Sequence, residues 1–109
     1  MIQLLALNKI IKNHDGWLLE HTTMEHFCNY RDEYIFISDW YKVNGTVPPE
    51  NEVLMLFPSF VLVNTTLTYE EILTKLQEER IYYATTKFVK EHKDDPYLKE
   101  HFIEFSKTL

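Results

Sequence analysis

Apolar residues recur at helical spacing along almost the whole chain, and only four prolines and two glycines interrupt the pattern. A repeat of about 3.6 residues predicts amphipathic helices, because every third or fourth side chain then lies on one face. The prolines stand at positions 48, 49, 58 and 96 and the glycines at positions 16 and 45, so the breaks are few and local. We therefore expect an all-α fold in one domain, since the 109 residues fit the usual size of roughly 100–200 residues per domain.

Residues 1–67 are expected to form a compact helical head. A first helix is predicted over residues 2–13, followed by a short helix or turn at 17–19. Thr22 and Glu25 have the spacing of a capping box, which predicts one or two helical turns ending at Phe27.

The next helix is predicted over residues 29–43, with Gly45 as its left-handed cap. Apolar side chains cover most of its circumference, which indicates a central, largely buried helix. They are Tyr34, Phe36, Ile37, Trp40, Tyr41 and Val43. A short helix then begins near Pro48 and Pro49 and ends before Pro58. The β-branched run at 60–63 is compatible with a strand, but no second strand is predicted to pair with it, so we expect an extended segment.

Residues 68–109 are expected to form a helical hairpin. Thr68 and Glu71 have capping-box spacing, and Leu67 and Ile72 stand at the two positions of a hydrophobic staple, so a long helix begins here and runs to about residues 90–93. Its early apolar stripe consists of Tyr69, Ile72, Leu73 and Leu76, and its later, rotated stripe of Ile81, Ala84, Phe88 and Val89. Asp95 is the expected N-cap and Pro96 the expected first residue of a last helix, whose stripe is Leu98, Phe102, Phe105 and Leu109.

Several classes of function are excluded or disfavoured by composition. The two glycines are too far apart for a dinucleotide-binding fingerprint or a P-loop, and we predict no cofactor. The formal net charge of −6 disfavours tight nucleic-acid binding, which depends on Lys and Arg. Cys28 is the only cysteine, the start has no secretory pattern, and no apolar run reaches the ~20 residues that span a bilayer. We expect a cytoplasmic protein without a membrane partner.

No catalytic or metal site is predicted. His14 and Asp15 could be ligands of a metal-dependent hydrolase together with His26, but their position in a helix exit favours a solvated turn. His21, His26 and Cys28 lack the spacing of a zinc site. The carboxylate pairs 70–71 and 78–79 diverge around their helix, which is typical of a solvated face.

The order of particular residues resembles the N-terminal domain of DnaB-type replicative helicases, especially their phage-like branch. The matching stretches are LLALNKIIK, MEHF, YRDEYIFISDWYKVNGTVPPENEV, YEEILTKLQEERIYY and DDPYLKEHFIEF. Within them the family pattern is matched by Glu25-His26-Phe27, by Arg31, Ile35 and Phe36, by Gly45, Val47, Pro48 and Val53, and by Glu79-Arg80. The resemblance covers nearly all of the chain and includes no catalytic motif.

This resemblance implies a helical head and hairpin that act as a collar on a hexameric motor. In the family, such domains dimerise through their hairpins, assemble as a trimer of dimers, and serve as the docking site of primase and of helicase loaders. The ATPase lies in a separate RecA-like motor, so we expect no enzymatic activity from this chain, whereas the full-length parent would be an ATP-dependent DNA helicase in a bacterial host cell. The alternatives are a stand-alone phage regulator that binds a replication protein and the metal-dependent hydrolase.

The predicted protein interface lies on the hairpin, because its two later stripes need a partner. The stripes can pack on each other or on a second subunit, and tyrosine is common at interfaces. The residues predicted for self-association are Ile81, Tyr82, Ala84, Phe88, Leu98, Phe102 and Phe105.

Overall fold

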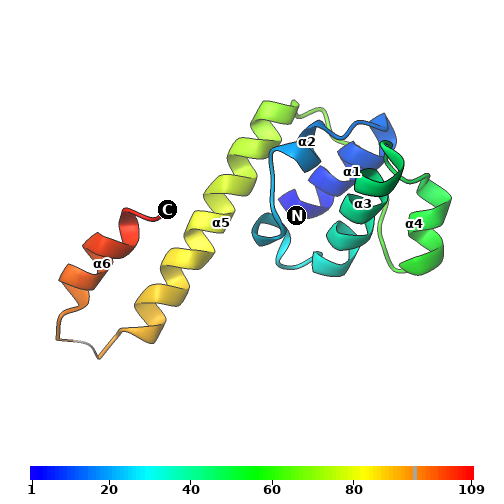
Figure 1. The fold of residues 1–109 in the computed structure, drawn as a ribbon. Coiled ribbons are helices and arrows are strands. Elements are labelled where there is room, and N and C mark those ends of the chain that lie inside the picture. The colour runs from blue at the N-terminus through cyan, green and yellow to red at the C-terminus, as the bar shows by residue number, and fades with distance from the viewer. Residues whose placement is uncertain (95) are drawn as a thin grey trace. The chain divides into compact units, whose positions relative to one another are not determined.

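A computed structural model describes residues 1–94 and 96–109, and within these residues the regular structure is entirely helical (Figure 1). The α-helices are α1 (Ile2–Asn13), α2 (Trp17–Glu20), α3 (Arg31–Asn44), α4 (Glu50–Leu56), α5 (Tyr69–Glu91) and α6 (Leu98–Ser106), and Met24–Phe27 forms the 3-10 helix η1. The expected all-α class is therefore confirmed. None of the helices in the described part of the chain is long and apolar enough to cross a membrane.

The chain divides into two compact units, Met1–Leu76 and Gln77–Leu109, and each is described separately. The first unit, called the head from here on, contains α1 to α4 and the first two turns of α5. The second unit, called the hairpin, contains the rest of α5 and α6.

The centre of the head is α1, which has the predicted bounds. Seven of its twelve residues are buried, and they cover most of its circumference. They are Gln3, Leu4, Ala6, Leu7, Asn8, Ile10 and Ile11. The helix ends at His14, which takes the left-handed conformation with φ 48° and donates its backbone N–H to the carbonyls of Ile10 and Ile11.

The prediction that α3 is the largely buried central helix is wrong. Only Tyr34, Ile37 and Ser38 are buried in α3, and Val43 is 83% exposed. The reason is that α1 already fills the centre, so α3 contributes one face to the core and leaves another outside. The helix ends where predicted, at Gly45 with φ 72°.

The predicted capping box at Thr22 and Glu25 is also wrong by one residue. Thr23 is the N-cap of η1, and its backbone N–H donates to Nδ1 of His26 at 3.0 Å. The Thr22 hydroxyl instead donates to the carbonyl of Leu18 at 2.6 Å and so satisfies the end of α2. Thr22 and Thr23 have the same side chain and either could cap η1. Thr22 bonds to α2 instead, which leaves Thr23 as the cap.

The segment from residue 60 to 63 is extended and belongs to no strand, as expected. Asn8 is fully buried, and its side chain serves as the hydrogen-bonding partner that a neighbouring strand would otherwise supply. Its Nδ2 donates to the Val61 carbonyl at 3.0 Å, and its Oδ1 accepts the Val63 N–H at 2.9 Å. Before this segment, α4 ends just ahead of Pro58, as predicted.

The predicted start of the long helix α5 is confirmed. The Thr68 hydroxyl accepts the Glu71 N–H at 3.1 Å, which is one half of the expected capping box. Ile72 and Leu76 are fully buried in the core, with Tyr69 and Leu73 packed against it. The early stripe of α5 therefore belongs to the head.

The last helix begins later than predicted. Pro96 precedes the helix, Tyr97 is the N-cap, and Leu98 is the first helical residue. The proposed N-cap Asp95 lies outside the described residues.

Candidate protein-binding surfaces

Phe88 of α5 and Phe102 and Phe105 of α6 form the centre of the hairpin. The Phe88 and Phe105 rings are stacked with their centroids 4.4 Å apart, and the Phe102 ring lies 5.9 Å from Phe88. His92 stacks on the other side of Phe88 at 4.1 Å and lies 6.1 Å from His101. Phe88 lies next to Phe105, whereas His92, farther along α5, lies next to His101, which comes earlier in α6. The two helices are therefore antiparallel.

The structure thus brings together three of the seven predicted interface residues. Ala84 and Leu98 are half-buried, whereas Ile81 is 38% and Tyr82 65% exposed. Tyr82 makes a ring contact with Tyr83, 5.8 Å away. Within the hairpin, Phe88, Phe102 and Phe105 are partly buried against one another, whereas Ile81, the first residue of the later stripe, remains exposed.

Among the described residues from 77 to 109, no side chain is buried. Even the three phenylalanines remain partly exposed. Further large apolar side chains are exposed on the same unit, namely Ile81, Tyr82, Tyr83, Val89, Tyr97, Ile103 and Leu109. So many exposed large apolar side chains on one small unit make it a candidate interaction site.

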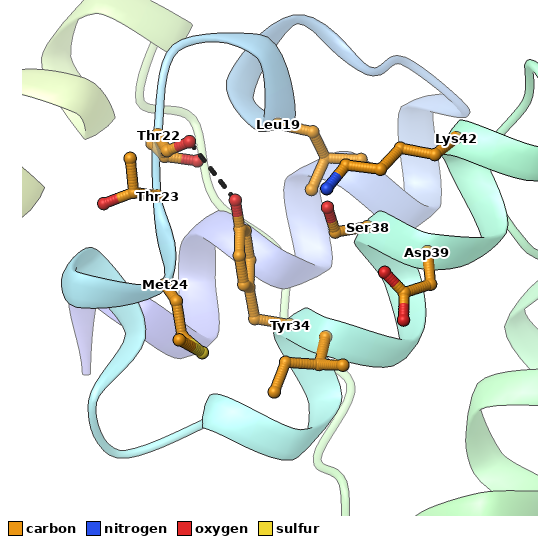
Figure 2. Close-up of a pocket in the computed structure, with 9 residues that line it drawn as sticks. Leu19, Thr22, Thr23, Met24, Tyr34, Ser38, Asp39 and Lys42 are labelled. Carbon is orange, nitrogen blue, oxygen red and sulfur yellow. Dashed lines mark hydrogen bonds between the residues drawn. The ribbon is translucent and has the colours of Figure 1, made fainter.

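A second candidate site is a pocket of about 340 Å³ in the head, between α3 and the segment that enters η1 (Figure 2). Leu19, Met24, Tyr34 and Ile35 supply its apolar walls, and Asp39 and Lys42 lie at its edge. The Tyr34 hydroxyl crosses the pocket to donate to the Thr22 carbonyl at 3.2 Å.

Ser38 is the nearly buried hydroxyl of this pocket that belongs to α3. It is 8% exposed. Sequence patterns did not single out this pocket, because the η1 segment and α3 meet only in the folded chain. The only sequence signal for the pocket was the spacing of Tyr34, Ser38 and Lys42, which places the three side chains on one face of a helix.

The residues considered for hydrolase chemistry are engaged in structural contacts. Asp15 accepts the Trp17 N–H at 2.9 Å and the Tyr69 hydroxyl at 3.1 Å. The pKa of Tyr69 is raised above its ordinary value, mainly by burial and further by the hydrogen bond to Asp15. His14 ends α1, and His26 takes part in the η1 cap. No group of three His, Cys, Asp or Glu side chains suited to a metal occurs among the described residues.

Comparison with protein-family models, with curated proteins and with solved structures yields no match for the chain.

Proposed function

We propose that the chain is the N-terminal collar domain of a hexameric replicative DNA helicase, which self-associates through its hairpin and docks a primase or a loader. One observation carries the self-association: the hairpin exposes several large apolar side chains and has no buried side chain among its described residues. The second unit contributes only α6 and the later part of α5, and helices shorter than ~12–15 residues are marginal alone in water.

A second copy of the hairpin is the partner that best fits this surface. Two antiparallel hairpins can pack face to face as a four-helix arrangement, and a two-fold axis places the same residues on both sides. Residues 77–109 contain six Lys or Arg and seven Asp or Glu, so their charges nearly balance and two copies do not repel strongly.

The resemblance to DnaB-type helicases supports the collar and the docking role. Its support consists of the order of elements and residue types, from the Glu25-His26-Phe27 turn to the Glu79-Arg80 pair. The ATPase motor would lie outside this chain, so the chain by itself acts by assembly and docking rather than by catalysis.

Self-association can be tested with Ile81→Glu, because Ile81 is exposed in the hairpin and its replacement leaves the core intact. We expect the wild-type chain to form dimers by light scattering as its concentration rises through the micromolar range. We expect Ile81→Glu to remain monomeric, because a carboxylate in an apolar interface must be desolvated without a partner.

Thr74→Glu is the matched control, since Thr74 is exposed on the same helix but belongs to the head and not to the hairpin. This variant should dimerise like the wild type. A wild-type chain that stays monomeric at high micromolar concentration would contradict the proposal, as would equal effects of the two variants. The reading frame gives an independent check, because a collar domain should be followed in its parent gene by a P-loop motor.

A further inference from the structure

Three aromatic side chains of the head form a cluster outside its core. The Phe36 ring of α3 lies 5.8 Å from Trp40 and 6.0 Å from Phe57, which directly follows α4. Phe57 packs against the buried core, whereas Phe36 and Trp40 remain half-buried without belonging to it. The cluster therefore joins α3 to α4 and presents aromatic surface to the outside.

Exposed aliphatic side chains extend this cluster on both helices. Val43 lies on the same face of α3 as Phe36 and Trp40, at helical spacing, and is 83% exposed. Met55 and Leu56, which immediately precede Phe57, are 74% and 63% exposed. We call the following six residues the α3–α4 surface, of which Met55 and Leu56 are included because they directly precede Phe57: Phe36, Trp40, Val43, Met55, Leu56 and Phe57.

Carboxylates accompany this surface. Asp32, Glu33 and Asp39 fall within about a quarter turn of the Phe36 direction on α3, as expected from 3.6 residues per turn. Glu50 and Glu52 stand in the first turn of α4. Lys42 is the only basic residue between positions 32 and 57, and, like Asp39, it lies at the edge of the pocket. In the part of the chain that the structure describes, none of the five carboxylates forms an ion pair.

We infer that the α3–α4 surface docks an amphipathic helix of a partner protein whose apolar stripe is flanked by Lys or Arg. Apolar anchors at helical spacing would pack on the aromatic cluster, and the flanking cations would meet the unpaired carboxylates. The inference deepens the docking part of the proposed function and does not use the hairpin.

The charge of the head argues against other occupants. Residues 1–76 contain five Lys or Arg and ten Asp or Glu, so a second copy of the head would bring like charge against like charge. Single-stranded nucleic acid could stack on the aromatic rings, but its binding requires a positively charged groove. Anionic lipid surfaces are disfavoured for the same reason.

The two tryptophans of the full chain provide a reporter and an internal control. Trp40 lies in the α3–α4 surface, whereas Trp17 is stacked on His21 at 3.9 Å and on Tyr69 at 5.6 Å, elsewhere in the head. The probe is a synthetic peptide of about 18 residues, long enough to form a helix, with Leu on one face and Lys on the other. We expect it to shift the Trp40 indole N–H signal saturably, with no shift for Trp17, and to bind more weakly as salt is added.

Charge reversal on the surface supplies the decisive comparison. Asp32→Lys combined with Asp39→Lys should weaken binding by about tenfold or more. Glu70→Lys combined with Glu78→Lys makes the same change of net charge at exposed positions of α5 and should alter binding by no more than about twofold.

Several results would overturn the inference: no shift of Trp40, equal weakening by both charge reversals, or equal binding of a peptide with Glu in place of Lys. A shift of Trp40 by a single-stranded oligonucleotide would do so as well. The titration is repeated with Ile81→Glu, and unchanged binding there separates the docking surface from self-association through the hairpin.

Discussion

Gly16 shows how a residue can be constrained by a contact that is distant in sequence. Its position after α1 suggested a turn, but the left-handed turn residue is His14, and Gly16 has an ordinary φ of −86°. A Cβ at Gly16 would overlap the ring of Tyr41, whose hydroxyl donates to Glu20 Oε1 at 2.9 Å. A side chain at position 16 would therefore require the Tyr41 ring to move away from the backbone.

The bond between Tyr41 and Glu20 has a consequence for titration. Donation of the Tyr41 proton to the Glu20 carboxylate is the main cause that raises the pKa of Tyr41 above its ordinary value of 10.0. The folded state thus holds this proton more tightly than the unfolded state. The resulting stabilisation is fully present below pH 10 and is lost as the pH rises through the raised pKa.

We predict that Gly16→Ala displaces the Tyr41 ring, lowers the free energy of unfolding by no more than about 1 kcal/mol because the bond to Glu20 is lost, and returns the pKa of Tyr41 toward its ordinary value. Urea unfolding and NMR titration of the tyrosine rings measure the two effects. Gly45→Ala is the control, because it strains a left-handed backbone without meeting any side chain, so it should cost stability and leave the titration of Tyr41 unchanged. An unaltered pKa of Tyr41 in Gly16→Ala would refute the explanation.

At the scale of elements, local signals predicted most of the fold. The start of α5 follows from Thr68, the end of α3 from Gly45, and the length of α4 from the prolines around it, because caps and breaks act on neighbouring residues. The buried faces were harder to predict. The apolar pattern of α3 is compatible with a central helix, and only the packing of α1 in that place decides against it.

The extended segment at 60–63 depends on a side chain that the sequence did not single out. Asn8 is a polar residue within an apolar helix, and its amide bonds three backbone groups, including those of Val61 and Val63. Lys12 holds the same region from outside, through an exposed bond to Asn64 at 2.6 Å. The contribution to stability of the buried bonds from Asn8 can therefore be compared with that of the exposed bond from Lys12.

We predict that Asn8→Leu lowers the free energy of unfolding by about 2–3 kcal/mol and speeds hydrogen exchange at the Val63 amide, since the segment loses its buried partner. Lys12→Ala should change stability by no more than about 0.5 kcal/mol, because its bond is solvated. Denaturant unfolding and amide exchange measure these effects. A fully protected Val63 amide in Asn8→Leu would show that the segment is held by other contacts.

For the whole molecule, the contrast in burial between the head and the hairpin is the feature most relevant to function. The later stripe of α5 and the stripe of α6 predicted that these helices need a partner, either each other or a second subunit, because their apolar periodicity is strong. The contact of Phe88 with Phe102 and Phe105 could therefore be predicted from sequence, whereas the α3–α4 surface could not. Phe57 meets Phe36 only in the folded chain, because 21 positions separate them in sequence.

This contrast leads to a prediction for hydrogen exchange in the wild-type chain. If the hairpin is completed by a second copy, the amides of α6 should be nearly unprotected at low concentration and gain protection when the concentration is raised about a hundredfold. The amides of α1 should keep the same protection throughout, because the seven buried residues of that helix already have their partners within the head. Hydrogen exchange measured by mass spectrometry at the two concentrations follows α6 and α1 side by side, so α1 is the internal control. Strong protection of α6 that does not change with concentration would mean that the hairpin is stable as a monomer, and its apolar surface would then need an explanation other than self-association.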